Sequence, residues 1–202
     1  MAVVAMDGSR VRSGGGVAHL RAILNFGNPQ SFGIDVVHFW GDAELCNEIK
    51  GADWLVKHHL DFRNTTMVRQ LYWQRYTLPQ LLVSHGVDLL FNADAGSVCK
   101  FYPSVTLSQD MLSFEPGEIF RYWHLPRRFL RLLLLRYVQL QSLRTSVCAL
   151  FLSQYAEATI SSLTSIKKSY VIPHGIDSCF DNINMSSRIQ RNFVIKCLYI
   201  SN

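Results

Sequence analysis

Three consecutive glycines follow the first apolar segment of the sequence. Gly14, Gly15 and Gly16 come shortly after a strand-like run at residues 3–6 and directly precede a helical pattern. Residues without a side chain let the backbone approach a ligand closely. The first turn of a helix adds free N–H groups and the positive end of the helix dipole. The loop is therefore a candidate anion site, with a plain turn between strand and helix as the alternative.

The spacing of this loop excludes two common nucleotide sites. No glycine follows at the position that a dinucleotide fingerprint needs, and no Gly-Lys-Ser/Thr sequence follows as in a phosphate-binding P-loop. A dehydrogenase, an epimerase or an NTPase is therefore disfavoured.

Polar residues follow several later strand-like segments at the same relative position. In a parallel sheet the carboxyl ends of the strands meet at one edge, where ligands bind. The amide of Asn92 and the carboxylate of Asp94, followed by Gly96, suit hydrogen bonds to the hydroxyl groups of a sugar. The candidates are Asn92, Asp94, Gln109, Asp110, Ser153 and His174. For Asp94 and Asp110 the alternative is an ordinary cap of a helix or a turn.

Short apolar segments alternate with helical patterns along most of the chain. Strands are expected at residues 3–6, 35–40, 54–58, 88–92, 104–108, 148–153 and 170–172, and helices at 16–26, 66–84, 127–145 and 154–163. Short apolar strands separated by helices predict a parallel sheet that is covered on both faces. The predicted fold class is α/β, with a doubly wound, mostly parallel, Rossmann-like sheet.

The last expected strand leads into the sequence SYVIPHGID at residues 169–177. Pro173 cannot donate to a sheet, and Gly175 lets the chain leave it sharply. Together with the SGGG sequence at residues 13–16, this segment resembles the two ends of the N-terminal domain of retaining GT-B-fold glycosyltransferases of the family 4 type. The resemblance extends from the glycine loop to Asp177.

The resemblance implies a function and a set of partners. The expected substrates are a nucleotide-sugar donor and a glycan or lipid-linked acceptor, as in glycan or polysaccharide assembly, with no cofactor, no metal and no nucleic acid. Gly14, Gly15 and Gly16 are implied to lie beside the donor diphosphate and the acceptor. Many relatives carry a histidine near the transferred sugar where this chain has Gln109 and Asp110. Gln109 can hydrogen-bond a sugar hydroxyl but cannot act as a protonated partner.

The remaining roles and the domain boundaries also follow from the resemblance. The residues implied to line the acceptor cleft are Asn92, Asp94, Ser153 and His174. Residues 1–177 are expected to form the acceptor-side domain, and residues 178–192 a linker. Residues 193–202 are expected to form the first strand of a second domain, which binds the nucleotide. A chain of this extent is expected to be inactive on its own.

Arginines are frequent in and around the long apolar helix expected at 127–145. Arg131 falls on a narrow polar face, whereas Arg136 falls among leucines, where a guanidinium must pair, extend to solvent or meet a phosphate. A buried helix that covers the sheet is one interpretation, and docking to an anionic membrane surface is the other. The arginines of this membrane or anion patch are Arg121, Arg127, Arg128, Arg131 and Arg136. A non-catalytic module that docks through this helix is the alternative function.

Composition sets the remaining bounds. A chain of 202 residues that is 49% hydrophobic can build a core, and its net charge of +5 favours anionic partners. Five widely spaced cysteines predict free thiols, and seven histidines without ligand spacing predict no metal site. The start is expected to be a strand rather than a signal peptide, and no apolar run reaches spanning length. A cytoplasmic protein, free or peripheral at the inner face of the membrane, is expected.

Overall fold

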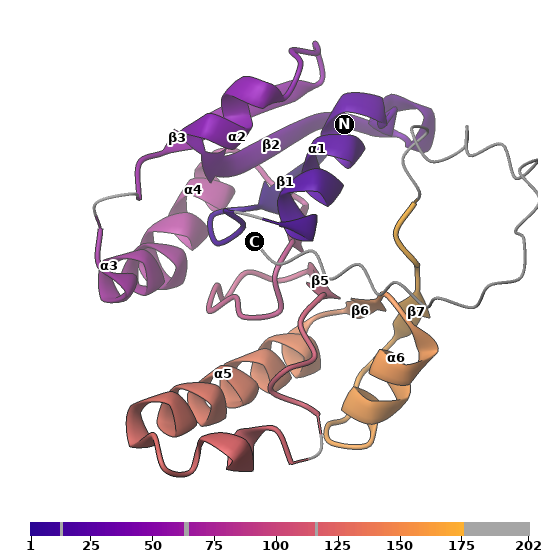
Figure 1. The fold of residues 1–202 in the computed structure, drawn as a ribbon. Coiled ribbons are helices and arrows are strands. Elements are labelled where there is room, and N and C mark those ends of the chain that lie inside the picture. Colours follow the sequence, from indigo (N-terminus) through magenta and orange to yellow (C-terminus); the bar gives the residue numbers. More distant parts are fainter. Residues whose placement is uncertain (13, 63–64, 116, 176–202) are drawn as a thin grey trace, which may run out of the picture.

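A computed structural model describes residues 1–12, 14–62, 65–115 and 117–175. Seven strands form one all-parallel sheet in the order β3-β2-β1-β4-β5-β6-β7 (Figure 1). The strands are β1 (Ala2–Asp7), β2 (Ile34–Asp42), β3 (Leu55–Leu60), β4 (Leu89–Asn92), β5 (Ser104–Ser108), β6 (Cys148–Phe151) and β7 (Ser169–Val171). The predicted Rossmann-like α/β fold is confirmed, and the strand order reverses between β1 and β4.

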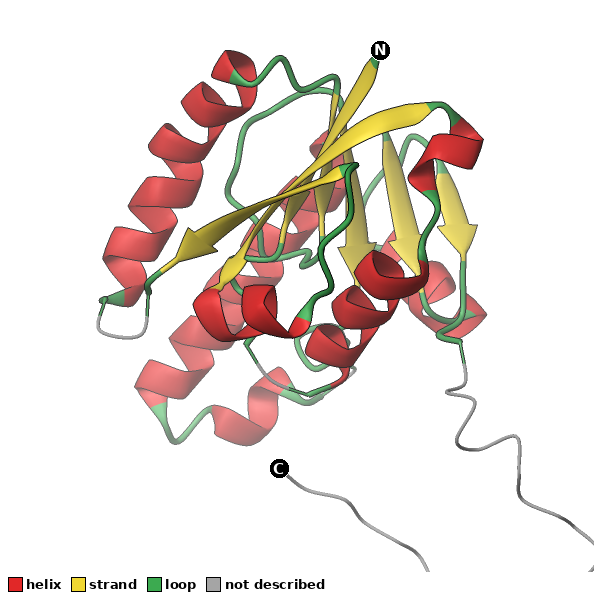
Figure 2. Ribbon diagram, turned by 90° about the horizontal axis from the view of Figure 1, so that it is seen from above, coloured by secondary structure: helices red, strands yellow, loops and turns green. Residues whose placement is uncertain are grey.

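Helices cover both faces of the sheet (Figure 2). The α-helices are α1 (Gly15–Phe26), α2 (Ala43–Glu48), α3 (Met67–Tyr72), α4 (Leu78–Ser84), α5 (Pro126–Thr145) and α6 (Gln154–Ser161), joined by a π turn, η2 (Trp73–Thr77), and two 3-10 turns, η1 (Pro29–Phe32) and η3 (Ile119–Tyr122). One core lies under α1 and α2, and two cores on the opposite face lie under α4 and under α5 with α6. Right-handed crossovers require this division, because chain segments that move in opposite directions along the sheet cover opposite faces.

The helix predicted at residues 66–84 is present but contains a π turn. Thr66 caps its start by accepting a hydrogen bond from the backbone N–H of Arg69. The wider turn of η2 directly precedes Pro79, which has no N–H for the carbonyl of Arg75 and whose ring would crowd it in a regular helix. The proline is therefore accommodated by a local change of helix type rather than by a break.

Helix α2 was not expected from the sequence. It has only six residues, too few to show a helical period. The Asp42 side chain accepts a hydrogen bond from the N–H of Glu44 at 3.0 Å, and Leu45 and Cys46 are buried in the core. The Asp42 cap and the packing of the buried side chains both stabilise this short helix. The cap is a local interaction, whereas the packing depends on the tertiary fold.

Several expectations concern residues outside the described ranges. These are the domain boundary at Asp177, the linker at 178–192, the strand at 193–202, and Cys179 and Cys197. Among the described cysteines, Cys46, Cys99 and Cys148 are free thiols, as predicted. Within the described ranges, no helix combines the length and apolar character that crossing a bilayer requires.

The ring of Phe39 is fully buried between two glycines. A Cβ added to Gly41 would lie 2.5 Å from Phe39 Cε1 and Cζ, and one added to Gly8 would lie 2.7 Å from Cε2. Such contacts are impossible without movement of the ring, which the close-packed core resists. The bend of the chain at the end of β1 and the position of Phe39 on β2 are therefore coupled.

We expect Gly41→Ala to lower the free energy of unfolding by about 1–3 kcal/mol, because the methyl group overpacks the core. Urea denaturation measures this loss. Gly51→Ala is the matched control, since its Cβ would meet no atom within 4 Å, and its change should stay within about 0.5 kcal/mol. Equal stabilities of the two variants would contradict the role assigned to Phe39.

Candidate functional site

The carboxyl ends of the neighbouring parallel strands β1, β4 and β5 lie at the same edge of the sheet. Asp7 is in register with Asn92, and Asn92 with Thr106. Because the strand order reverses between β1 and β4, the segments that follow these strands diverge toward opposite faces and leave room for a ligand. This is the switch point at which an open parallel sheet binds its ligands.

The glycine loop leaves the start of α1 uncovered. Gly14 is the N-cap with φ of 71°, a left-handed conformation that favours glycine, and no side chain of the described residues caps the helix. A Cβ on Gly14 or Gly15 would meet no atom within 4 Å, and the first turn of α1 contains no acid. The backbone N–H groups of this turn lack a side-chain cap, and the anion site expected from the sequence at this loop stays a prediction.

Gln109 lies directly against this loop. A Cβ added to Gly16 would lie 3.3 Å from Gln109 Oε1 and 3.0 Å from Val11 Cγ1, so a larger residue would require these side chains to shift by a few tenths of an ångström. Gln109 Nε2 donates a hydrogen bond to the carbonyl of Ala93 at 3.2 Å. The structure thus brings the candidate residue after β5 into contact with the candidate loop after β1.

An ion pair joins the loops that follow β1 and β4. Arg10 Nε lies 3.1 Å from Asp94 Oδ2, and Arg10 Nη1 donates to the carbonyl of Gly96 at 3.0 Å. Asp94 Oδ1 also accepts a hydrogen bond from the N–H of Gly96, so it caps a turn rather than a helix. Sequence reasoning missed Arg10, although its place three residues after β1 was a usable signal.

Asp7 is a second residue that sequence reasoning missed. Its carboxylate is buried and accepts hydrogen bonds from the N–H of Ser9 at 3.0 Å and from Gln74 Nε2 at 2.6 Å. Gln74 is buried as well, and its Oε1 accepts from the N–H of Val98 at 3.1 Å. Burial raises the pKa of the Asp7 carboxyl group above its usual value, against the lowering effect of these donors.

Two buried polar atoms near the switch point have no hydrogen-bond partner among the described residues. They are Oδ1 of Asn92 and Oγ of Ser108, at the ends of β4 and β5. Asn92 Nδ2 donates to Thr106 Oγ1 at 3.2 Å, which fixes the orientation of the amide. An unpaired buried polar atom costs about 1–3 kcal/mol, so two such atoms at the ends of neighbouring strands indicate a place for water or a ligand.

The other predicted edge residues have local partners. Asp110 Oδ1 accepts a hydrogen bond from the N–H of Leu112 at 2.9 Å, and Ser153 caps α6 through the N–H of Ala156 at 3.2 Å. Both are therefore in the capping geometry, which for Asp110 was the stated alternative. His174 Nδ1 lies 3.0 Å from His19 Nδ1, which connects the segment after β7 to α1. The two motifs that carry the family resemblance thus meet through α1.

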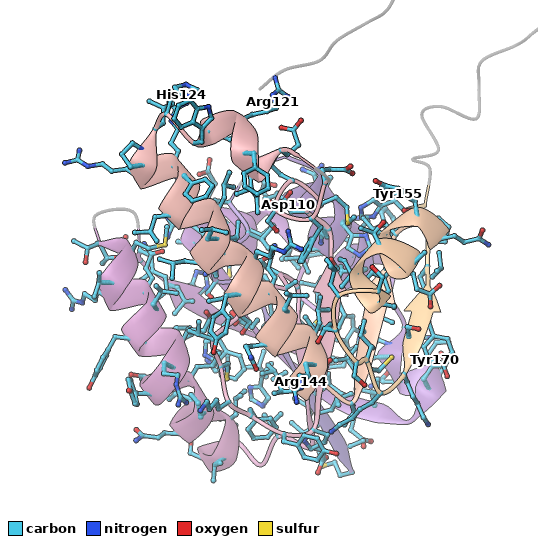
Figure 3. The ribbon with its side chains drawn as sticks, turned by 90° about the horizontal axis from the view of Figure 1, so that it is seen from below. Asp110, Arg121, His124, Arg144, Tyr155 and Tyr170 are labelled. Carbon is cyan, nitrogen blue, oxygen red and sulfur yellow. The ribbon has the colours of Figure 1, made fainter. Side chains whose placement is uncertain are left out.

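The surface formed by η3 and α5 differs from the interpretation of α5 as a buried helix. Gln139 and Leu143 are its fully buried residues, both in its second half. In and directly after η3, and in the first twelve residues of α5, large apolar side chains are exposed: Phe120, Trp123, Leu130, Leu133, Leu134 and Tyr137. The first half of α5 thus does not cover the sheet, and Arg121 and His124 lie at the end of this surface far from Arg144 (Figure 3).

The predicted arginine patch is distributed over this η3–α5 surface. Arg127, Arg128 and Arg131 are exposed, and Arg121 pairs with Glu118 at 2.7 Å on the surface. Arg136 lies over the ring of Phe114 at 6.0 Å, so a cation–π contact occupies the guanidinium that the sequence placed among leucines.

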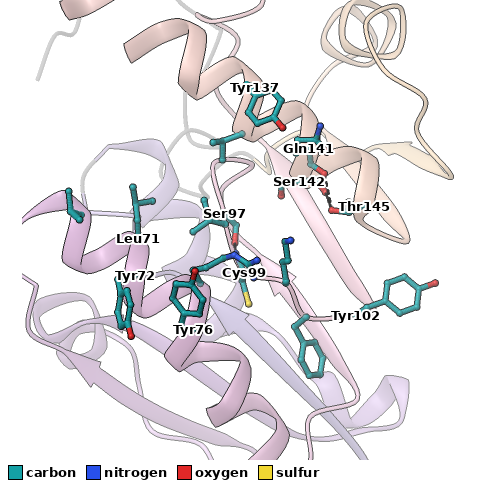
Figure 4. A pocket seen from close by; sticks show the side chains of 16 residues that line it. Leu71, Tyr72, Tyr76, Ser97, Cys99, Tyr102, Tyr137, Gln141, Ser142 and Thr145 are labelled. Carbon is teal, nitrogen blue, oxygen red and sulfur yellow. Dashed lines mark hydrogen bonds between the residues drawn. The ribbon is translucent and has the colours of Figure 1, made fainter. Parts of the chain in front are cut away.

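A groove of about 850 Å³ separates α3 and η2 from α5 (Figure 4). Its floor is the segment 97–102, which connects β4 to β5 without a helix. Its walls carry exposed tyrosines and two cations, namely Tyr72, Tyr76, Tyr102, Tyr137, Arg75 and Lys100. The groove lies on the face opposite α1, and sequence reasoning did not predict it, because a missing crossover helix leaves no local pattern.

The chain's sheet topology and its switch point define an α/β domain of the Rossmann-like type. No family model and no curated protein matches the sequence. Solved structures do match its fold. Sucrose-phosphate synthase from Thermosynechococcus elongatus aligns with a TM-score of 0.61 at 14% identity, over 88% of this chain and 49% of that one.

Two further structures agree. HepE from Anabaena, in complex with UDP-glucose, aligns with a TM-score of 0.55 at 13% identity, over 88% of this chain and 45% of that one. A glycosyltransferase from Rickettsia africae aligns with a TM-score of 0.50 at 10% identity, over 90% and 45%. The chain thus spans about half the length of these proteins. Its fold is that of the Rossmann-like half of a GT-B glycosyltransferase.

The Asp7–Gln74–Val98 chain of hydrogen bonds gives a stability prediction. Gln74→Met leaves Asp7 Oδ2 and the N–H of Val98 without a partner, so we expect a loss of roughly 2–4 kcal/mol in the free energy of unfolding. The loss should grow from mildly acidic to neutral pH. The pKa of Asp7 in the folded state is already above its unfolded value, so ionisation disfavours the fold, and removal of a donor makes ionisation costlier.

Urea denaturation at both pH values measures this effect. Gln80→Met on the exposed face of α4 is the matched control and should change stability by no more than about 0.5 kcal/mol at either pH. A Gln74→Met loss that is independent of pH would show that the Asp7 carboxyl group is not the affected partner.

Proposed function

We propose that this chain forms the acceptor-side half of a retaining glycosyltransferase that uses a nucleotide-sugar donor. One observation carries the proposal: the uncapped, glycine-led start of α1 lies against Gln109 at the switch point of the sheet. The shared fold with glycosyltransferases supports it, as does the presence of UDP-glucose in the HepE structure.

The proposed chemistry follows from the charges at this edge. When a sugar leaves a nucleoside diphosphate, negative charge develops on the diphosphate oxygen, and preorganised N–H donors stabilise it. The first turn of α1 offers such donors together with its dipole. The guanidinium of Arg10, three residues beyond β1, pairs with the carboxylate of Asp94, so this acid does not oppose the developing charge.

Gln109 is proposed to position the transferred sugar. Its Nε2 is bound to the Ala93 carbonyl, which leaves Oε1 beside Gly16 to accept a hydrogen bond from a sugar hydroxyl. A glutamine holds no titratable proton, so its role is orientation rather than proton transfer. Asn92, Asp94 and His174 frame the acceptor side, with Ser153 and Asp110 further along the same edge.

The remaining half of the site is proposed to come from a second domain, which holds the nucleotide. The acceptor is proposed to be a glycan or a lipid-linked sugar. On this proposal the chain by itself binds a nucleotide sugar weakly at the glycine loop and transfers no sugar.

Nuclear magnetic resonance tests the proposal. Titration of the ¹⁵N-labelled chain with UDP-glucose should shift the backbone amides of residues 14–17 and 93–96 most strongly. Gly15→Asp should abolish these shifts, because it places a negative charge at the helix start in a position where a side chain meets no other atom. An activity assay of the wild-type chain alone with UDP-glucose should detect no transfer.

Gly51→Asp is the matched control, since it adds the same charge at another open position and should leave the shifts unchanged. Shifts confined to other parts of the chain, or shifts that persist in Gly15→Asp, would refute the glycine loop as the donor site. Robust transfer by the chain alone would refute the need for a second domain.

A second candidate function is docking to an anionic membrane surface through the η3–α5 surface. The specific observation is the exposure of Phe120 (70%) and Trp123 (75%) next to exposed arginines. Aromatic side chains at the lipid headgroup level and cations against anionic lipids are the two components of interfacial binding. Such docking is compatible with a lipid-linked acceptor and equally with a module that has no catalytic role.

Co-sedimentation with vesicles tests this docking. The chain should bind vesicles with anionic lipid and lose most binding in purely zwitterionic vesicles or at high salt. Replacing both Phe120 and Trp123 by Ser should reduce binding at least about tenfold through the loss of buried apolar area. Phe26 and Phe32, near α1, are 84% and 83% exposed. Replacing both of them by Ser is the control and should leave vesicle binding unchanged.

The Gly15→Asp variant separates the two functions. Vesicle binding that survives in this variant shows that docking and donor binding are independent. Equal loss in the test pair and in the control pair would refute the η3–α5 surface as the docking site.

A further inference from the structure

Three histidines from different elements meet on the face of the sheet covered by α4. They are His38 in β2, His58 in β3 and His85 at the end of α4. One ring nitrogen of each lies within 4.8 Å of the ring nitrogens of the other two. Their separations of 20 and 27 residues along the chain match no metal-binding motif, which is why the sequence predicted no metal site here.

The contacts within this histidine cluster are direct. His38 Nδ1 lies 2.9 Å from His58 Nε2, and the two ring centroids are 5.2 Å apart, so the nitrogen edges of the rings face each other. The ring of His85 lies 4.7 Å from that of His38 and 5.1 Å from that of His58. In the absence of an ion, a 2.9 Å contact of this kind requires the two nitrogens to share one proton.

The histidine cluster is fixed on its sheet side and accessible on its solvent side. The indole of Trp40 is buried and stacks on His58 at 4.3 Å with an angle of 7° between the planes. His38 is 9% exposed, whereas His85 is exposed at the end of its helix. Two ligands are thus fixed by the sheet, and the third is on the solvent side, where an ion can enter.

We propose that His38, His58 and His85 bind one Zn²⁺ ion that joins β2, β3 and the end of α4. Imidazole nitrogen is a preferred ligand of Zn²⁺, and three protein ligands with solvent as the fourth make an accepted tetrahedral set. Zn–N bonds of about 2.0–2.1 Å place neighbouring nitrogens about 3.3 Å apart. The His38–His58 contact therefore has to open by a few tenths of an ångström while the ion replaces the shared proton.

The protonation states agree with this geometry. Burial lowers the pKa of His38, and burial together with the neighbouring histidines lowers the pKa of His58 to about 4. Both rings are therefore neutral at neutral pH, the form that ligates a metal.

The role of the ion is structural. β3 is the edge strand of the sheet and pairs only with β2 among the described strands. A metal bound by His58, His38 and His85 connects β3 to β2 within the sheet and to the end of α4. The cluster lies on the face opposite α1, away from the glycine loop, so this role is separate from the proposed sugar transfer.

Titration of the metal-free chain with Zn²⁺ in a calorimeter tests the proposal. We expect one ion per chain and a higher melting temperature in Zn²⁺ than in chelator, because an ion that binds only the folded state stabilises it. His85→Ala removes an exposed ligand with little risk to folding and should weaken Zn²⁺ binding by roughly 100-fold or more, since even the loss of an outer-shell partner costs about 10–100-fold. Co²⁺ should give the intense visible absorption of a four-coordinate site in the wild type and not in His85→Ala.

His59→Ala is the matched control. His59 is the exposed neighbour of His58 in β3, and alternation along a strand directs it to the other face. Its removal should leave affinity, stoichiometry and the Co²⁺ spectrum unchanged. The proposal is overturned if the wild type takes up no Zn²⁺, or if His59→Ala weakens binding as much as His85→Ala does.

Discussion

The hydrogen bonds to the buried carboxyl group of Asp7 are the interaction on which the carboxyl edge of the sheet depends. This group is buried at the end of β1 and is held by the N–H of Ser9 and by Gln74. Gln74 in turn holds the N–H of Val98, so one chain of hydrogen bonds fixes the exit of β1, the π turn η2 and the segment after β4. A buried carboxyl group that lost these partners would carry its full desolvation cost. These buried hydrogen bonds therefore restrain the loops at the switch point.

The charges at this edge are arranged in favour of an anionic ligand. Burial disfavours the charged form of Asp7, and Arg10 pairs with the carboxylate of Asp94. What remains facing the opening is the uncapped start of α1, whose first turn contains no acid. Two acidic residues thus stand at the switch point without making it repulsive to a diphosphate. This local arrangement, more than the net charge of the chain, is the physical basis of the proposed anion site.

The direct connection from β4 to β5 accounts for the groove on this side of the sheet. Residues 97–102 connect the two strands without forming a helix, and the groove between α3 and α5 lies over this segment. The first half of α5 has no fully buried residue, so its leucines and the aromatic residues in and after η3 stay exposed.

The sequence by itself determined the elements and their class, because strand and helix periods are local properties of the chain. All seven strands lie where the pattern predicts them, and so do the four predicted helices, of which the one at 66–84 comprises α3, η2 and α4. The glycine loop could be located from its place between a strand and a helix. Only the tertiary structure decided which polar residues share a site. The contact of Gln109 with Gly16, the pairing of Arg10 with Asp94 and the meeting of three histidines join residues far apart in the chain. Such contacts depend on strand order and crossover direction, for which no local period exists.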